Sequence, residues 1–181
     1  MIAPPIEGPR LALGPLSEAD AGSRYLAWLN DPDVVRLTEA RHTGHSADSI
    51  REFIAACNAC PHTWLWGIFE RVGGMHVGNI KLGPVASVHR CGALGLIIGE
   101  RSRWGRGYAT EALGLAVRLA FEELHLHKIV AGVIAGNDAS LRAFESNGFV
   151  VEGTRRRQNL LEGVWRDEIQ LGLLCEEHQG G

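Results

Sequence analysis

The chain has 181 residues, of which 45% are hydrophobic, and a formal net charge of -3. This length and hydrophobic share predict a single globular domain over residues 1–181, with a core from about residue 10 to 174. A slightly acidic chain gives no reason to expect nucleic acid as a partner. No run of residues approaches the roughly 18 apolar positions of a membrane span, and residues 1–15 lack a signal-peptide pattern. We therefore expect a cytoplasmic protein with no nucleic-acid or membrane partner.

The four cysteines predict neither a metal centre nor a redox motif. Cys57 and Cys60 form a Cys-x-x-Cys pattern with His62 close behind, but no second pair of ligands accompanies it. A zinc site normally needs that second pair, and a thioredoxin-like motif needs a preceding strand. We expect these cysteines to act as small apolar residues at the end of a helix, and we expect no bound metal.

The N-terminal third is expected to form one strand followed by helices. Alternating polar and apolar residues predict the strand. Ser17 and Asp20 have the spacing of a capping box, which marks the start of a helix, and Pro32 suits the first position of another. The predicted elements are a strand over residues 10–13 and helices over residues 17–30, 32–37 and 46–57.

The remainder of the chain predicts alternating strands and helices. Ser140 is expected to begin a short helix that ends at Asn147-Gly148, a pair that supplies a left-handed cap. Strands are predicted over residues 64–70, 76–82, 94–99, 128–134, 149–152 and 165–174, and a long helix over residues 108–124. The last two strands should flank a long hairpin loop. The resulting order, β-α-α-α-β-β-β-α-β-α-β-β, predicts an α/β fold in which helices cover both faces of a mixed sheet.

The turn after the strand at residues 94–99 has the composition of a phosphate site. A helix N-terminus carries unpaired N–H groups and a positive dipole end. Gly105 and Gly107 would let phosphate oxygens approach the backbone, and Arg101, Arg103 and Arg106 would add charge. Neither a Walker loop nor a dinucleotide fingerprint fits the spacing. The alternative is a plain strand–turn–helix with a basic rim.

This turn resembles the acyl-CoA-binding motif of the GNAT superfamily of N-acetyltransferases. The family pattern is Gln/Arg-x-x-Gly-x-Gly/Ala. Gly105-Arg106-Gly107 fits it, although Ser102 stands at the leading position. The longer string from Trp104 to Ala112 is similar to the branch that contains the ribosomal-protein-alanine N-acetyltransferases.

A second motif, Asn137 to Ser140 followed by Phe144 and Gly148-Phe149, also resembles the family. The resemblance implies the GNAT fold, in which two parallel strands of a mixed sheet splay apart and hold the pantetheine arm of acetyl-CoA. It further implies that a backbone N–H near Ile97 or Ile98 contacts the thioester. The implied cofactor-binding residues are Ile97, Ile98, Arg103, Trp104, Gly105, Arg106, Gly107, Tyr108, Ala109, Asn137, Ser140 and Phe144.

The same resemblance implies direct acetyl transfer with Asn137 and Ser140 in the catalytic site. Many relatives protonate the departing thiolate with a tyrosine, but Phe144 stands at that position and has no proton to give. Ser140 is the expected substitute, and Asn137 would hold pantetheine. The structural alternatives are a helix cap for Ser140 and a turn residue for Asn137.

The sequence does not identify the general base. Many GNAT enzymes place a carboxylate on the central strand, and this strand has none. His76, His89, Asp167 and Glu39 are candidates, as is a chain of water molecules. An α-amino group with a pKa near 7.8 is partly neutral at pH 7, so it depends less on a general base than an alkylamine with a pKa near 10.4 does. The implied acceptor is a primary amine of a small molecule, an amino sugar included, or of a protein N-terminus.

Acceptor specificity is expected from the N-terminal helices and the loop over residues 153–165. Asp31, Asp33 and Glu39 would attract an ammonium group. The arginines at 155–157 are interpreted as a solvated face, and the alternative is that they contact a phosphorylated or nucleotide-linked substrate. A non-catalytic acyl-CoA binder or sensor is the competing function. The oligomeric state is open, with a homodimer as one candidate.

Overall fold

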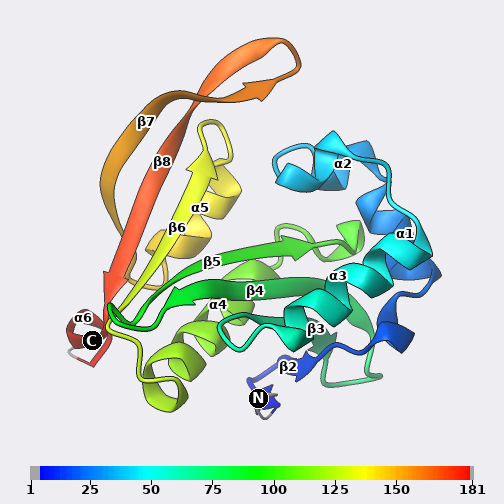
Figure 1. The fold of residues 1–181 in the computed structure, drawn as a ribbon, viewed down its shortest axis with the longest axis horizontal. Helices are drawn as coiled ribbons and strands as arrows, with labels where there is room; N and C mark the ends of the chain where they lie inside the picture. Colours follow the sequence, from blue (N-terminus) through cyan, green and yellow to red (C-terminus); the bar gives the residue numbers. More distant parts are fainter. Residues whose placement is uncertain (1–4, 180–181) are drawn as a thin grey trace.

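A computed structural model describes residues 5–179 of the chain. Its centre is one eight-stranded mixed sheet with the strand order β1-β2-β3-β4-β5-β6-β8-β7, drawn in Figure 1. The strands are β1 Ile6–Glu7, β2 Leu11–Pro15, β3 Trp64–Glu70, β4 His76–Ala86, β5 Cys91–Ile98, β6 Lys128–Ile134, β7 Val150–Leu161 and β8 Val164–Leu174. The predicted α/β class with a mixed sheet is confirmed.

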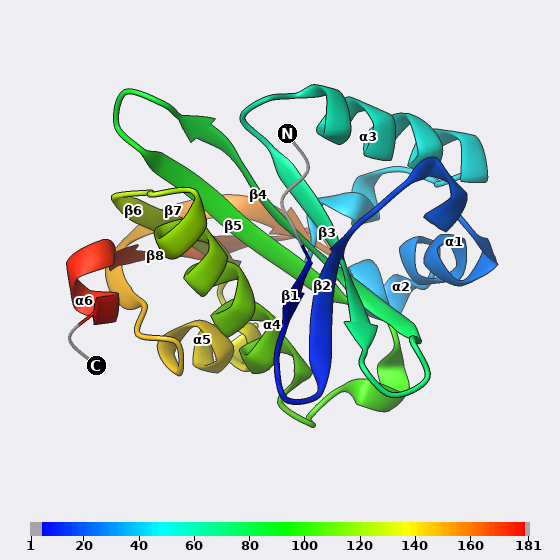
Figure 2. The same ribbon diagram turned by 90° about the horizontal axis from the view of Figure 1, so that it is seen from below.

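Helices cover both faces of this sheet, as Figure 2 shows. One face carries α1 Ser23–Leu29, α2 Pro32–Val35 and α3 Ala47–Ala59, and the other carries α4 Tyr108–Arg118 and α5 Asp138–Glu145. A π-helical turn, Leu119–Glu123, continues α4, and α6 Cys175–Gln179 follows the last strand. Short 3-10 turns lie at Glu18–Asp20, Glu39–His42 and Arg101–Arg103. Between residues 5 and 179, no helix combines the length and the hydropathy that crossing a membrane requires.

The parallel strands β5 and β6 separate along their length. They pair only where Cys91–Ala93 lies beside Lys128–Val130. Beyond Ala93, β5 continues beside β4 alone, and β6 continues beside β8 alone. A gap therefore opens between residues 94–98 and 131–134, which confirms the expected splay.

Two apolar clusters hold the edges of this gap in place. The larger cluster packs α4 against the sheet and includes the fully buried Leu113 and Ile129. The smaller one lies on the opposite face, beneath α1 and α3, and includes Trp28 and Ile54. The Trp28 ring packs on Gly99, where an added Cβ would lie only 2.0 Å from a ring atom. Gly99, at the end of β5, is thus required by close packing rather than by a turn.

The predicted start of the first helix was wrong. Asp20 accepts hydrogen bonds from the Ser17 N–H and hydroxyl, as a capping box requires, yet only a 3-10 turn follows. The helix itself begins at Ser23, because the backbone leaves helical geometry at Ala21 and Gly22.

The loop expected over residues 153–165 is instead an extension of the last two strands. β7 and β8 pair as far as Leu161 and Val164. The two residues between them, Glu162 and Gly163, have φ of 51° and 79°, as a tight two-residue hairpin turn requires. Glu-Gly signals such a turn more weakly than Asn-Gly does, so the sequence pattern suggested a loop.

Candidate active site

A cleft of about 910 Å³ lies at the β5–β6 gap. Its walls include residues 94–97 of β5 and 132–134 of β6, together with side chains from α1, α3 and the β7–β8 hairpin. The hairpin reaches across toward α2 (Figure 1), where the Arg36 guanidinium contacts the Glu162 carboxylate at 2.7 Å. The cleft is therefore bounded by the splayed sheet, the N-terminal helices and the hairpin.

Alternate backbone N–H groups of β5 point into the gap, and the Ile98 N–H is one of them. The Gly99 N–H donates to the Val77 carbonyl across the β4–β5 ladder at 3.0 Å. Since backbone groups alternate in direction along a strand, the Ile97 N–H also faces β4 and the Ile98 N–H faces the gap. The Ile98 carbonyl, which faces the same way, accepts from the Trp104 indole N–H at 2.7 Å. Of the two residues expected near the thioester, the geometry favours Ile98.

The glycine turn leads from β5 into α4 on the exposed surface. Gly105 and Gly107 have φ of 69° and 74°, a left-handed conformation that a side chain would strain. Gly107 is the N-cap of α4, so the first N–H groups of that helix, from Tyr108 onward, have no intrahelical partner. The turn lies outside the residues that line the cleft and adjoins it through the end of β5.

Only one of the three arginines expected at the phosphate site keeps an unpaired guanidinium. Arg101 contacts Asp33 at 2.7 Å, and Arg103 contacts Glu70 at 2.7 Å. Across residues 5–179, Arg106 has no acidic partner. Arg106 and the α4 N-terminus are therefore the positive groups left for an anion.

Glu70 also accepts from the Tyr108 hydroxyl at 2.5 Å. Hydrogen bonds from Arg103 first, and then from Tyr108, hold the pKa of Glu70 below its usual range. Tyr108 and Arg103 were both expected to bind the cofactor, but their side chains are hydrogen-bonded to Glu70. We therefore expect these two residues to contact a bound ligand through their backbone N–H groups.

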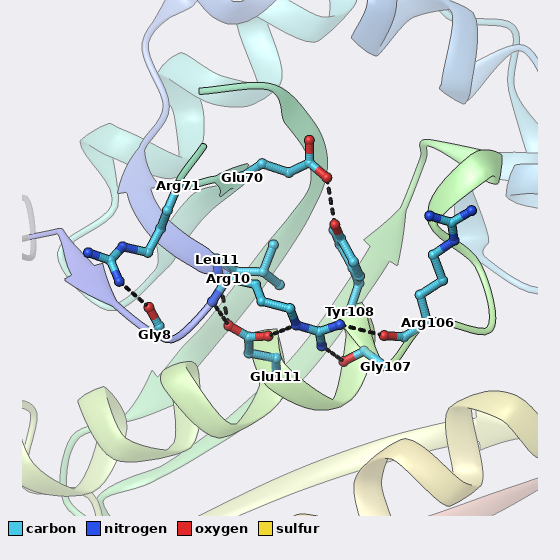
Figure 3. Close-up of polar contacts among 9 residues, drawn as sticks. All are labelled: Gly8, Arg10, Leu11, Glu70, Arg71, Arg106, Gly107, Tyr108 and Glu111. Atoms are coloured by element: carbon cyan, nitrogen blue, oxygen red, sulfur yellow. Dashed lines mark hydrogen bonds and ion pairs between the residues drawn. The ribbon is translucent and has the colours of Figure 1, made fainter. Parts of the chain in front are cut away.

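A cluster around Arg10 fixes the carbonyl side of the turn (Figure 3). The Arg10 guanidinium donates to the carbonyls of Arg106 and Gly107 at 2.8 and 3.2 Å. Its Nε contacts Glu111 at 2.7 Å, and Glu111 also accepts from the N–H groups of Arg10 and Leu11 at 2.7 and 2.9 Å. Burial alone would raise the pKa of Glu111, but these hydrogen bonds hold it below its usual range. Glu111 thus joins the start of β2 to the first turn of α4.

Asn137, Ser140 and Phe144 all line the cleft. The expectation that Ser140 starts α5 was wrong: the helix begins at Asp138, and Asn137 is its N-cap. The Asn137 Oδ1 accepts from the Ser140 N–H at 3.2 Å. Phe144 is 2% exposed and packs edge-to-face on Phe149, so it also belongs to the core.

Three of the four candidate bases are not among the residues that line the cleft. The His76 ring packs between aromatic side chains, 4.8 Å from Phe69 and 4.9 Å from Trp28, and burial lowers its pKa. His89 lies in the exposed turn between β4 and β5, and Asp167 accepts from the Arg157 N–H at 2.8 Å. Glu39 alone of the four lines the cleft.

Residues 10–150 match the family model of the acetyltransferase (GNAT) domain. The chain belongs to the GNAT acetyltransferase family. A probable N-acetyltransferase of Bacillus subtilis, YjcK, is 34% identical over 110 residues, 60% of this chain and 60% of that protein. The [ribosomal protein uS5]-alanine N-acetyltransferase of Escherichia coli is 33% identical over 112 residues, 62% of this chain and 55% of that protein. The match thus spans little more than half the length of these relatives.

A solved structure, spermidine N-acetyltransferase from Vibrio cholerae in complex with CoA and spermine, has the same fold. It superposes with a TM-score of 0.85 and 21% identity, covering 95% of this chain and 99% of that one. This likeness shows that the GNAT fold extends over the strands and helices outside residues 10–150.

Glu168 is a carboxylate in the cleft of this GNAT domain that the sequence analysis missed. It lies over Gly132 of β6, where an added Cβ would be 3.0 Å from its carboxyl carbon, and accepts from Gln170 Nε2 at 2.6 Å. Residues 168 and 170 alternate along β8 and therefore lie on one face of the sheet. This signal could have identified Glu168 if the pairing of β8 with β6 had been known from the sequence. Asp31 and Asp33 instead contact Arg101, and neither lines the cleft.

Metal-binding groups do not gather in the described part of this GNAT domain. Over residues 5–179, no three His, Cys, Asp or Glu side chains lie close enough together to hold a metal ion. Cys57 is buried on α3, and Cys60 is the C-cap residue of that helix.

The capping role of Asn137 and its expected role in holding pantetheine can be separated by substitution. Asn137→Asp keeps the oxygen that caps α5 but loses the amide donor, so we expect unchanged stability and a several-fold higher KM for acetyl-CoA. Asn137→Ala should instead cost about 1 kcal/mol of stability, the usual effect of a lost cap. Thermal unfolding and acetyl-CoA titration of both variants measure this. An Asn137→Asp variant with the wild-type KM would limit Asn137 to capping.

Proposed function

We propose that this chain transfers the acetyl group of acetyl-CoA directly to a primary amine of a small molecule or of a protein N-terminus. The observation that carries this proposal is the β5–β6 gap with the Ile98 N–H facing into it, followed at once by the glycine turn of α4. Family membership and relatives named as N-acetyltransferases support the reaction type.

The residues present suit acetyl-CoA in both charge and shape. The N-terminus of α4 and the Arg106 guanidinium would face the pyrophosphate, since both are positive and exposed. The pantetheine arm would lie along residues 94–98 of β5, pairing with the free backbone groups as an added strand does. The Asn137 amide, at the cleft wall, would donate to its amide oxygens.

The chemistry then needs three protein groups. As the acceptor nitrogen forms its bond to the acetyl carbon, the Ile98 N–H would stabilise the negative charge that develops on the carbonyl oxygen. The C–S bond breaks, the Ser140 hydroxyl would give its proton to the departing sulfur, and the Ser140 oxygen would take a proton from solvent water in return. The ammonium proton would pass to a cleft carboxylate, Glu39 or Glu168, directly or through water.

Relatives support both classes of acceptor. The Escherichia coli relative is named for an alanine of a ribosomal protein, and the Vibrio cholerae structure contains spermine. We propose a cytoplasmic location, because Cys57, Cys60 and Cys91 are free thiols, as expected in a reducing compartment.

The test is release of free CoA thiol from acetyl-CoA in the presence of a panel of primary amines. Turnover of at least one amine, with the acetylated product identified by mass spectrometry, is the expected result. Binding of acetyl-CoA without turnover of any amine would favour the second candidate, an acyl-CoA sensor. That candidate is favoured by Phe144, which has no hydroxyl where many relatives have a tyrosine.

Ser140→Ala is expected to lower kcat by about tenfold. General acids contribute about 10²–10⁴-fold in many enzymes. A thiolate with a pKa near 8.5 leaves more readily than an alkoxide, so the smaller effect is expected here. The cap of α5 uses the backbone N–H of residue 140, which alanine retains, and stability should not change. Steady-state kinetics of Ser140→Ala measure this effect. A kcat equal to that of the wild type across pH 6–9 would show that water, and not Ser140, protonates the departing sulfur.

A further inference from the structure

The floor of the cleft presents hydrogen-bond donors from β4. Asn79 and Lys81 occupy alternate positions of this strand and both line the cleft. Alternate strand residues share a face and lie about 7 Å apart. Their neighbours in the ladder, Leu65 and Ile97, pack with the cluster beneath α1 and α3, which places both donors on the side of the sheet that those helices cover.

The orientation of the Asn79 amide follows from its partner. His76 Nε2 lies 2.9 Å from both the Gly78 carbonyl and the Asn79 Oδ1. Two oxygens around one nitrogen require that this nitrogen carries the hydrogen. The other end of the amide is therefore the Nδ2 group. Asn79 is 4% exposed, and its Nδ2 has no hydrogen-bond partner among residues 5–179.

A buried amide donor without a partner is unfavourable unless a ligand or a water molecule accepts from it. Because Asn79 is part of the cleft wall, an oxygen of a bound acceptor is a suitable partner. The sequence showed no signal for this, since an isolated asparagine in a strand carries no motif.

Lys81 makes the same part of the cleft positive. Its Nζ lies 5.9 Å from the centre of the Phe53 ring, and no acid within residues 5–179 pairs with it. The two cleft carboxylates already have cationic neighbours: Glu39 contacts Arg41 at 3.3 Å, and Glu168 contacts Arg155 at 3.5 Å.

We propose that the acceptor is a primary amine with an oxygen near its nitrogen, such as an amino-acyl compound or an amino sugar, and that Asn79 Nδ2 donates to this oxygen. The proposal rests on the proposed acetyl transfer. The same groups disfavour an aliphatic polyamine as the acceptor. Its charged nitrogens are hydrogen-bond donors and cannot accept from Asn79 Nδ2, and its additional positive charges are repelled by Lys81.

The experiment measures kcat/KM of the full chain for four acceptors with saturating acetyl-CoA. L-alaninamide and D-glucosamine carry the oxygen from two different sources, isobutylamine lacks it, and spermidine represents the polyamines. Because these amines differ in intrinsic reactivity, the decisive quantity is the ratio of wild-type to variant kcat/KM for each acceptor.

Asn79→Leu should lower kcat/KM for L-alaninamide, D-glucosamine or both by at least about tenfold more than for isobutylamine, since tenfold corresponds to one modest hydrogen bond. Lys81→Met should raise kcat/KM for spermidine at least about threefold. Asn58→Leu is the matched control: its Nδ2 donates to the Leu16 carbonyl outside the cleft, so it should affect all acceptors alike.

Equal losses for all four acceptors in Asn79→Leu would overturn the proposal, as would a wild-type preference for spermidine. Should Asn79→Leu fail to fold, Asn79→Asp keeps an oxygen for His76 and replaces the donor with an acceptor, which should shift preference toward spermidine. An unshifted preference in Asn79→Asp would also overturn the inference. Failure of the proposed function is recognised separately, as acetyl-CoA binding without turnover of any amine.

Discussion

Arg10→Ala is expected to raise the KM for acetyl-CoA by at least about tenfold and to change kcat less than about threefold. The Arg10 guanidinium holds the carbonyls of Arg106 and Gly107 (Figure 3), and this keeps the opposite side of the turn, with its N–H groups, available to an anion. Hydrogen bonds from a charged donor contribute about 1.5–3 kcal/mol each, and 1.4 kcal/mol corresponds to tenfold. Arg10 makes no contact with the gap, so the acetyl-transfer step should be preserved.

Two further variants distinguish this role from a general loss of stability. Arg71→Ala is the matched control, because Arg71 contacts Gly8 and Glu7 on the same side of the molecule without touching the turn. Arg10→Lys should recover part of the affinity by keeping the charge. A tenfold lower kcat with the wild-type KM in Arg10→Ala would contradict this assignment.

The same substitution should lower the stability of the domain more at neutral pH than in acid. The pKa of Glu111 is lowered in the folded state, so its stabilisation is fully present above the unfolded value near 4.3 and is lost as pH falls through the folded pKa. Arg10→Ala removes part of this stabilisation at neutral pH, about 0.5–1 kcal/mol for a half-exposed partner. Urea unfolding at pH 7 and pH 3 should show a smaller wild-type-to-variant difference at pH 3.

Ile98→Pro is expected to lower kcat by about 10²–10³-fold, the effect of losing one oxyanion donor. Proline removes the N–H that faces the gap. That N–H makes no bond to β4, so the sheet ladder should tolerate the change. Melting temperature and acetyl-CoA affinity should therefore change little. Steady-state kinetics with a saturating amine measure the effect.

Ile98→Val is the matched control, because it alters the side chain and keeps the N–H. It should retain kcat within about threefold. A proline variant that folds, binds acetyl-CoA and keeps the wild-type kcat would show that another group contacts the carbonyl oxygen.

The strands at residues 64–70 and 128–134 were predicted with the bounds that the structure shows, because each is an apolar run ended by turn residues. The splay of the parallel pair was expected only from the resemblance to the GNAT family. The mixed sheet and the turn with Gly105 and Gly107 were accessible from residue type and order. These features are local, or follow from the order of elements along the chain.

What the sequence did not show depends on contacts between distant residues. Arg10 and Glu111 are 101 residues apart, and no periodicity links them. The pairing of Glu70 with Arg103, an expected phosphate ligand, was hidden for the same reason, because the two residues are far apart in the sequence. Glu168 could enter the cleft only once β7 and β8 were known to form a long hairpin beside β6.

The most direct test of the proposed acetyl-CoA site is a crystal structure of the chain with CoA bound. We expect the pantetheine arm in the gap between β5 and β6, with its pyrophosphate at the N–H groups of the Gly105–Gly107 turn. A CoA molecule bound elsewhere, with β5 and β6 closed against each other, would contradict the proposed site.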